Sequence, residues 1–321
     1  MIGLPLVYLL AGLMFAAFAG LSLADRENNK RLGNAAFWGL FALSFLAGDQ
    51  LGDLGNGVLA LALALIAGAG QLGVGVPRTT SPEERENLAA RYGPRLFIPA
   101  LVIPVLVLAG SLAFKRLTLH GAPLVDPKQA TLISLALAAL VAAVLAQILF
   151  RQPAGAAVQE GRRLMDLVGW AALLPQMLAA LGAVFALAGV GKTIGELAVM
   201  VTPADSRFAA VAAYCLGMAA FTIMMGNAFA AFPVMTGGIA LPLVIGRFGG
   251  DPAVVCAIGM LSGFCGTLLT PLAANFNLVP AALLQLKDRY AVIRAQAPTA
   301  VLMLIVNVIL MNALAFHAAR P

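Results

Sequence analysis

The chain has 321 residues, of which 61% are apolar and 11% are charged, with a formal net charge of +6. A soluble globular domain carries about 25% charge, so this composition excludes a soluble protein and provides for about ten apolar spans of ~20 residues each. Scattered Gly and Pro with only 7% aromatic residues disfavour a membrane β-barrel. The sequence has no basic stripe interleaved with stacking aromatics, so nucleic-acid binding is not predicted.

We therefore expect an all-α polytopic membrane protein with about 8–10 transmembrane or re-entrant helices. Residues 1–150 predict a scaffold-like bundle of about five spans. The apolar runs lie at residues 2–24, 34–48, 57–76, 96–114 and 130–150, with an acidic turn at 49–56.

The aqueous segment 77–95 separates the third span from the fourth. Within it, Ser81 and Glu84 predict a capping box around Pro82, and hence a short surface helix that ends at Gly93. Ten Lys and Arg residues follow spans one, three and five, whereas three follow spans two and four. This bias predicts an outside N-terminus and a cytoplasmic segment 77–95.

Residues 151–321 differ from the first 150 because charged and apolar residues mix in them and their apolar runs are interrupted. This pattern predicts a transport-like region. Residues 158–168 mix Arg162, Arg163 and Asp166 with apolar residues, which is typical of a helix lying in the membrane interface. Further spans are expected at 170–190 (interrupted at Pro175-Gln176), 208–225 and 298–316, with a second interfacial helix at 285–296.

Motifs for catalysis or nucleotide binding find no support. Residues 68–73 match a dinucleotide pattern but end an apolar helix, and Gly191-Lys192-Thr193 resembles a phosphate-binding loop that lacks its first glycine and preceding strand. His120 and His317 lie far apart, and the three cysteines lie in apolar segments without metal-ligand spacing. We expect no enzyme, no catalytic residue and no metal centre.

Two blocks between residues 222 and 280 carry the functional signal, because each is apolar enough for membrane depth yet interrupted by Gly and Pro. A broken helix in hydrocarbon leaves unpaired amides and carbonyls, which persist where protein or a watery cavity receives them. Paired breaks near the bilayer midplane point to a transporter site, whereas the alternative is that Asn and Thr only bond neighbouring helices. The predicted substrate- or ion-binding residues are Gly226, Asn227, Pro233, Thr236, Gly266, Thr267, Thr270, Pro271, Asn275 and Asn277.

The chemistry of this region follows from its lack of charge. Between residues 208 and 285 the only formal charges are Arg247 and Asp251, which flank a Gly-Gly turn. A proton relay ordinarily contains an intramembrane acid or histidine, so none is predicted here. Helix N-termini can hold a carboxylate through backbone amides, and unwound carbonyls with Asn and Thr oxygens can hold Na⁺. We expect a small anionic solute, with Na⁺ as the candidate coupling ion and no other cofactor.

The blocks GNAFAAFPVMT, from residue 226, and SGFCGTLLTPLAANFN, from residue 262, resemble the bacterial membrane family called domain of unknown function 979 (DUF979). The likeness extends along the full chain, including residues 288–296. That family is grouped with the ion-transporter superfamily of secondary carriers, which move carboxylates by an elevator motion. Its members are encoded beside a smaller membrane family and enzymes that handle pyroglutamate (5-oxoproline). The resemblance implies a carrier subunit for pyroglutamate or a related small acid, in the bacterial cytoplasmic (inner) membrane.

The first 150 residues depart from that superfamily, because they contain no second interrupted block to complete a pair of inverted repeats. Either the repeats have diverged, or half of the site comes from another polypeptide, as a second small membrane-protein subunit or a homo-oligomer would supply. The leading interpretation is a secondary transporter, or one subunit of a two-protein transporter. The alternative is a non-transporting membrane scaffold or anchor for a partner, and an intramembrane enzyme is third.

Overall fold

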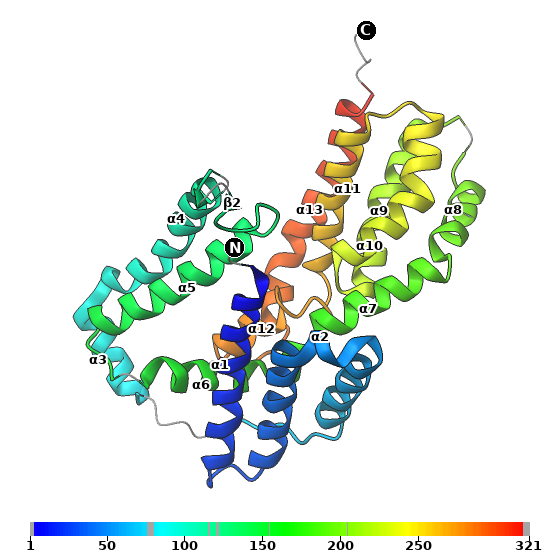
Figure 1. Ribbon diagram of the computed structural model, residues 1–321. Helices are drawn as coiled ribbons and strands as arrows, with labels where there is room; N and C mark the ends of the chain where they lie inside the picture. Colours follow the sequence, from blue (N-terminus) through cyan, green and yellow to red (C-terminus); the bar gives the residue numbers. More distant parts are fainter. Residues whose placement is uncertain are drawn as a thin grey trace. The chain divides into compact units, whose positions relative to one another are not determined.

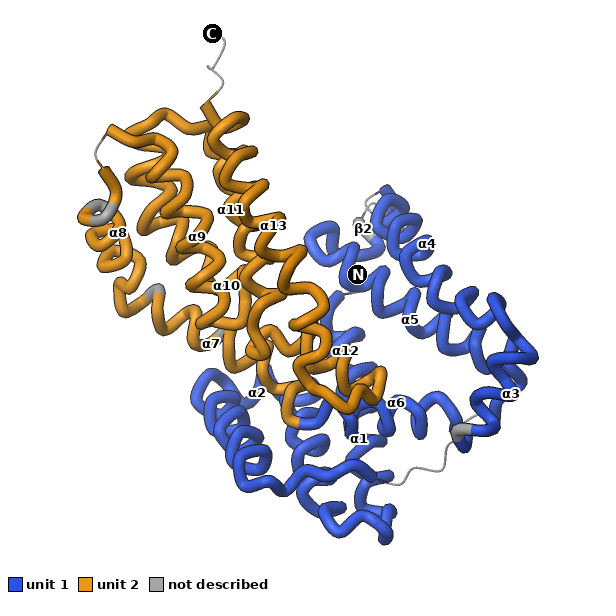
Figure 2. The backbone as a smooth tube through the Cα atoms, turned by 180° about the vertical axis from the view of Figure 1, so that it is seen from behind, with its two compact units in different colours: residues 1–169 blue, residues 170–321 orange. Residues whose placement is uncertain are grey.

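The computed structural model describes residues 3–75, 80–114, 116–119, 122–153, 155–203 and 205–316, so His120 and His317 lie outside the described residues. These ranges are almost entirely helical (Figure 1), and eight helices in them are long and apolar enough to cross a membrane. They are Leu4–Ala24, Arg31–Gly68, Glu83–Ala113, Ala130–Leu149, Ala156–Phe185, Arg207–Met225, Ala228–Arg247 and Ala291–Leu314. The prediction of an all-α, multi-pass membrane protein is confirmed at this level. The chain divides into two compact units, Met1–Gly169 and Trp170–Pro321 (Figure 2).

The first hairpin of unit 1 consists of α1 (Leu4–Ala24) and α2 (Arg31–Gly68). Its interface is aromatic, and the Phe15 ring stacks on buried Trp38 with centroids 5.7 Å apart. α2 is two helices that meet at Gly52, where a φ of +62° interrupts the helix inside the predicted acidic turn.

The predicted surface helix is α3 (Pro82–Tyr92). Its capping box is confirmed: the Glu84 N–H donates to Ser81 Oγ at 3.1 Å, and the Ser81 N–H donates to Glu84 Oε2 at 2.7 Å. The chain continues through η1 (Gly93–Phe97), α4 (Ile98–Ala113), the two-residue strands β1 (Thr118–Leu119) and β2 (Ala122–Pro123), and α5 (Ala130–Leu149). The predicted fourth and fifth spans therefore correspond to α4 and α5.

α6 (Ala156–Val168) has the predicted amphipathic pattern, but two of its charges are buried rather than wetted. Arg162 and Asp166 are 3% and 6% exposed. Arg162 forms ion pairs with Asp25 and, at 3.4 Å, with Asp166, and the Trp38 indole N–H donates to Asp166 Oδ1 at 2.9 Å. Partners on the first hairpin therefore replace water around these two charges. α6 thus belongs to compact unit 1, which ends at residue 169.

Unit 2 is built from nine helical segments in its described residues. They are the end of η2 (Gly169–Leu173), α7 (Leu174–Leu187), α8 (Val190–Val201), α9 (Arg207–Met225), α10 (Ala228–Met235), the π-helical η3 (Thr236–Arg247), α11 (Pro252–Thr267), α12 (Leu278–Leu283) and α13 (Ala291–Leu314). The predicted interruption of a span at Pro175 is not found. It lies in the first turn of α7, where proline fits because that turn needs no intrahelical N–H.

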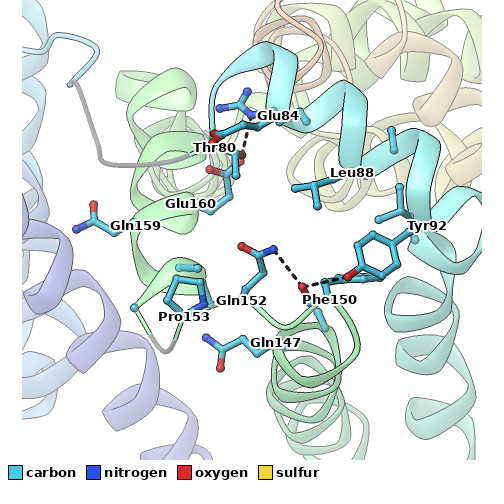
Figure 3. Close-up of a pocket in the computed structure, with 18 residues that line it drawn as sticks. Thr80, Glu84, Leu88, Tyr92, Gln147, Phe150, Gln152, Pro153, Gln159 and Glu160 are labelled. Carbon is cyan, nitrogen blue, oxygen red and sulfur yellow. Dashed lines mark hydrogen bonds between the residues drawn. The ribbon is translucent and has the colours of Figure 1, made fainter.

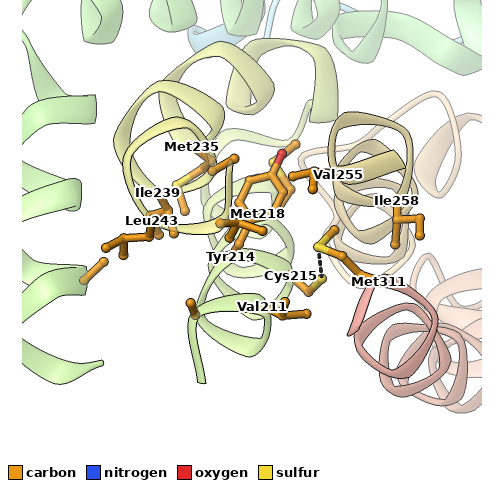
Figure 4. Packing of buried hydrophobic residues seen from close by; sticks show 14 of the residues in the cluster. Val211, Tyr214, Cys215, Met218, Met235, Ile239, Leu243, Val255, Ile258 and Met311 are labelled. Atoms are coloured by element: carbon orange, nitrogen blue, oxygen red, sulfur yellow. Dashed lines mark hydrogen bonds between the residues drawn. The ribbon is translucent and has the colours of Figure 1, made fainter. Parts of the chain in front are cut away.

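The core of unit 2 is an antiparallel bundle in which α10–η3 folds back along α9. Tyr214 on α9 and Thr236 at the start of η3 share a hydrogen bond of 2.9 Å in the buried interior. Figure 4 shows Tyr214 and Met218 packed between Met235 on one side and Met311 on the other. α11 lies beside α9, and Cys215 on α9 contacts Met311 on α13 with a sulfur–sulfur distance of 3.9 Å.

The prediction of a second interfacial helix at residues 285–296 is wrong. Gln285 has a φ of +53°, and the Tyr290 N–H donates to Asp288 Oδ1 at 2.9 Å, so residues 285–290 form turns instead. Residues from Ala291 onward already belong to α13, which contains Pro298 in its interior. The local turn chemistry of Asp288 therefore overrides the apolar spacing that predicted a separate helix.

Candidate functional site

The first predicted break is a two-residue turn that joins α9 to α10. Gly226 has a φ of +69°, a conformation that favours glycine, and its N–H donates to the Thr222 carbonyl at 2.7 Å. Asn227 caps α10, because its Oδ1 accepts the Phe229 N–H at 2.8 Å. The Asn227 amide nitrogen has no hydrogen-bond partner within the described part of the chain, so it is free to donate to a ligand.

The second predicted break, residues 268–277, is held in place by Asn277. This side chain is fully buried, and its Nδ2 donates to the carbonyls of Thr267 at 2.8 Å and Thr270 at 2.6 Å. Gln296 on α13 donates to Asn277 Oδ1 and, at 3.3 Å, to the Leu268 carbonyl. These bonds satisfy carbonyls that α11 leaves unpaired at its end. Asn277 thus joins chain segments, which is the helix-bonding role that the sequence left open as the alternative to ligand binding.

Both breaks line one cavity of about 160 Å³. Four predicted residues contribute to its wall, namely Gly226 and Asn227 from the first break and Thr267 and Asn275 from the second. The Phe229 and Phe264 rings also line it and pack edge to face with centroids 5.8 Å apart. Among the described residues, no charged side chain lines this cavity and no cluster of His, Cys, Asp or Glu could hold a metal ion.

Three predicted residues support the second break without lining the cavity. The Thr270 hydroxyl accepts the Leu272 N–H at 3.3 Å, and Pro271 lies half-buried in the same turn. Gly266 packs against the α9 backbone at Ala219, where a side chain would collide. These residues shape the loop that carries Asn275.

The structure places the other two predicted residues away from the breaks. Thr236 is buried in the bundle, where its hydroxyl bonds that of Tyr214. Pro233 is exposed on α10, two turns beyond the cap. One polar group near the first break lacks a partner: in the described part of the chain, the buried Thr222 Oγ1 makes no hydrogen bond.

The two breaks lie at the same end of the unit 2 bundle. α9 has 19 residues before its turn, or about 28 Å at 1.5 Å per residue, which nearly matches a hydrocarbon core of about 30 Å. α11 has 16 residues before its break, or about 24 Å. The sequence predicts breaks near mid-depth, whereas the structure sets each one after an almost complete span.

One protein-family model matches nearly the whole chain. The model described as "Protein of unknown function (DUF979)" matches residues 5–316. The chain belongs to this family. The DUF979 match includes both breaks and every predicted site residue, so the family resemblance read from those blocks is confirmed. No curated protein and no solved structure matches the chain.

The sequence does not single out two charged residues on α8. Lys192 and Glu196 are exposed, one turn apart, and face a groove of about 730 Å³ between α8 and α10–η3. Pro233, Gly237 and Pro242 line the opposite wall. The apolar run around the two charges has only 12 residues, so hydropathy alone leaves it outside a span. A pair of charges four residues apart in an apolar run between glycines is the signal that could have found them.

Unit 1 contains a larger cavity that holds none of the predicted site residues. It measures about 800 Å³ and lies between α3, the end of α5 and the start of α6 (Figure 3). Its polar side chains include Tyr92 and Gln152, which donate to the Phe150 carbonyl at 3.4 and 3.2 Å. Glu84, Gln159 and Glu160 also line the cavity, and the buried Gln159 Oε1 makes no hydrogen bond in the described part of the chain. Because the cavity contains none of the predicted residues, we assign it no part in the site.

Proposed function

We propose that this protein is a secondary membrane transporter, or one subunit of a two-protein transporter, for a small carboxylate such as pyroglutamate (5-oxoproline). The observation that carries the proposal is the shared cavity. Two interruptions about forty residues apart in the chain meet around a space that protein packing would ordinarily fill with side chains. Although both interruptions lie at the ends of spans rather than at mid-depth, they bring backbone groups and neutral side chains together around one space, as the sites of secondary carriers do.

The cavity favours a small solute with oxygen acceptors. Its volume of about 160 Å³ is below the ~300–1,000 Å³ of pockets that take drug-sized ligands. The unbonded Asn227 Nδ2 and the exposed Asn275 amide supply donors, and the positive end of α10 favours a carboxylate. Phe229 and Phe264 supply an apolar wall for the remainder of the solute.

The assembly that follows is a carrier of the ion-transporter superfamily in the bacterial inner membrane. Unit 1, which includes α6, would act as the scaffold and unit 2 as the moving part of an elevator. Na⁺ is the proposed coupling ion, because the buried Thr222 hydroxyl beside the turn is free to coordinate a cation. A second small membrane subunit, or a second copy of the chain, would complete the site that the first 150 residues do not duplicate.

Uptake of radiolabelled pyroglutamate into proteoliposomes tests the function directly. The full chain is reconstituted alone and together with any membrane subunit that co-purifies with it in mild detergent, with and without a Na⁺ gradient. Saturable uptake in either preparation supports the proposal. Absence of uptake from both, for pyroglutamate and for lactate and acetate, contradicts it and favours a non-transporting scaffold.

Two alanine variants test whether the cavity is the binding site. Asn275→Ala removes an exposed amide that makes no hydrogen bond elsewhere in the described chain, so binding should weaken while thermal stability holds. Losing a hydrogen bond to a charged ligand costs about 1.5–3 kcal/mol, or about 10- to 150-fold in affinity. Asn29→Ala, in the exposed α1–α2 loop, is the matched control. Unchanged affinity in Asn275→Ala would remove the cavity from the site.

A further inference from the structure

α8 lies beside the middle of a membrane-spanning segment. A side chain at Gly195 would collide with the Gly238 carbonyl, so the two helix backbones are in direct contact there. α10 and η3 form the candidate span Ala228–Arg247, and Gly238 is its eleventh residue. At 1.5 Å per residue, Gly238 lies about 15 Å from the start of a span that crosses about 30 Å of hydrocarbon. This part of α8 is therefore near mid-depth.

Lys192 and Glu196 thus occupy a depth at which charged side chains are rare. Both are exposed on the surface of unit 2, and neither forms an ion pair with another described residue. Intramembrane charges almost always face a bundle interior or a water-filled cavity, and they mark the paths of solutes or ions. The groove that they line has room for water and a small solute.

The opposite wall of the groove is formed where the helix is irregular. Pro233 and Pro242 both line it inside their helices, where proline cannot donate a backbone hydrogen bond. Gly237 lies between them and has open space where a side chain would stand. Irregular backbone at membrane depth is tolerated where it is buried in protein or lines a water-filled cavity. Irregular, π-helical backbone of this kind is frequent at functional sites.

We propose that this groove is hydrated and that Lys192 binds the carboxylate of the transported solute there. The inference rests on the proposed function and adds a second position for the solute carboxylate, in the groove, to the position proposed in the cavity at the breaks. An ammonium–carboxylate bond is stronger than one between neutral groups. Pro233 is six residues beyond Asn227 on α10, so the groove begins about 9 Å further along the helix than the cavity does.

A small hydrated carboxylate fits the groove better than a lipid tail or an apolar helix. Either of those would cover two charges without bonding them. A carboxylate with its water bonds the Lys192 ammonium. Glu196, one turn further along α8, balances the ammonium charge when no anion is bound.

Cysteine accessibility tests hydration independently of any solute. Glu196→Cys and Leu197→Cys are neighbours on α8, and Leu197 is 56% exposed but does not line the groove. In proteoliposomes, a small water-soluble methanethiosulfonate reagent should modify the Glu196→Cys variant much faster than the Leu197→Cys variant. The wild-type chain provides the background from its three native cysteines. Equal rates in the two variants, whether both fast or both slow, overturn the hydrated groove.

Affinity for pyroglutamate, measured by calorimetry on the purified full chain, tests the role of Lys192. Lys192→Met should weaken binding about 10- to 150-fold, whereas Lys192→Arg keeps the charge and should remain within about tenfold of wild type. Glu196→Gln should tighten binding, because it removes a negative charge near the bound anion. Lys128→Met, on an exposed loop of unit 1, is the control.

The outcomes separate this inference from the function on which it rests. If wild type binds pyroglutamate and Lys192→Met binds it equally well, Lys192 is not the anion site and the proposed function stands. If wild type binds neither pyroglutamate nor lactate nor acetate, the proposed function fails and this inference fails with it. Loss in Lys192→Met with retention in Lys192→Arg supports both.

Discussion

Replacing Arg162 by leucine should destabilise unit 1 by about 3–5 kcal/mol, the usual cost of removing one partner from a buried ion pair. The Arg162 side chain is 3% exposed, and its guanidinium reaches three separate groups on two segments. It pairs with Asp25, lies 3.4 Å from Asp166, and donates to the Leu21 carbonyl at 2.8 Å. Leucine keeps much of the volume but leaves two buried carboxylates without their cation.

The magnitude follows from what is left unpaired. The Leu21 carbonyl alone accounts for about 1–3 kcal/mol if it is left buried without a donor. Asp166 retains the Trp38 indole N–H at 2.9 Å and the Asn34 amide at 3.3 Å, which limits its share of the loss. Asp25 loses its ion pair with Arg162 at an almost fully buried position, which adds to the cost. Adding Asp25→Asn to Arg162→Leu should therefore recover part of the lost stability.

Equilibrium unfolding in mixed micelles measures the effect, followed by fluorescence in a Trp170→Phe background that leaves Trp38 as the single tryptophan. The neighbouring Arg163→Leu is the matched control. Among the described residues Arg163 pairs with Glu160 alone, whose side chain is 38% exposed, and such pairs contribute about 0–1 kcal/mol. A loss in Arg162→Leu no larger than in Arg163→Leu would refute the view that α6 is joined to the first hairpin by a buried charge cluster. So would a double variant no more stable than Arg162→Leu alone.

Three further expectations concern packing and orientation. Asn277→Ala should cost about 1–3 kcal/mol of stability for each of the two carbonyls left unpaired, seen as a lower unfolding midpoint. A midpoint equal to wild type would contradict the view that Asn277 holds the second break in place. Gly195→Ala should disrupt the α8–η3 contact and lower thermal stability, whereas Gly237→Ala, which has open space, should not; equal effects would contradict the close packing. Glu86→Cys on α3 should react with an impermeant reagent only after cell lysis, and labelling of intact cells would reverse the predicted orientation.

Much of the fold could be read from local sequence. The hydropathy of each apolar run predicts a span, and α1, α5 and α9 begin and end within a few residues of the runs that predict them. Gly226 and Asn227 were identifiable as a break because a left-handed residue followed by a capping side chain is a local signal. These properties depend on residues that are close together in the chain.

The roles of individual polar residues could not be read in this way. Asn275 and Asn277 are two positions apart and chemically identical, yet one is exposed at the cavity and the other is fully buried and bonded to three segments. Gln296, which completes that bonding, lies on another helix. Which of two asparagines faces a ligand depends on the neighbours that the folded chain brings to it.

The sequence by itself determined that the protein lies in a membrane, that it is helical, and that its chain is interrupted at Gly226 and near Pro271. The first two follow because transfer of each apolar run into hydrocarbon is a nearly additive, local quantity. Only the tertiary structure decided what happens to the charges. Asp25 and Arg162 are 137 residues apart and meet in the interior of unit 1. Lys192 reaches mid-depth only because α8 packs against a span that starts more than thirty residues later. The stability of a charge in a membrane protein depends on partners and water at its final position, and those are properties of long-range contacts rather than of the residue itself.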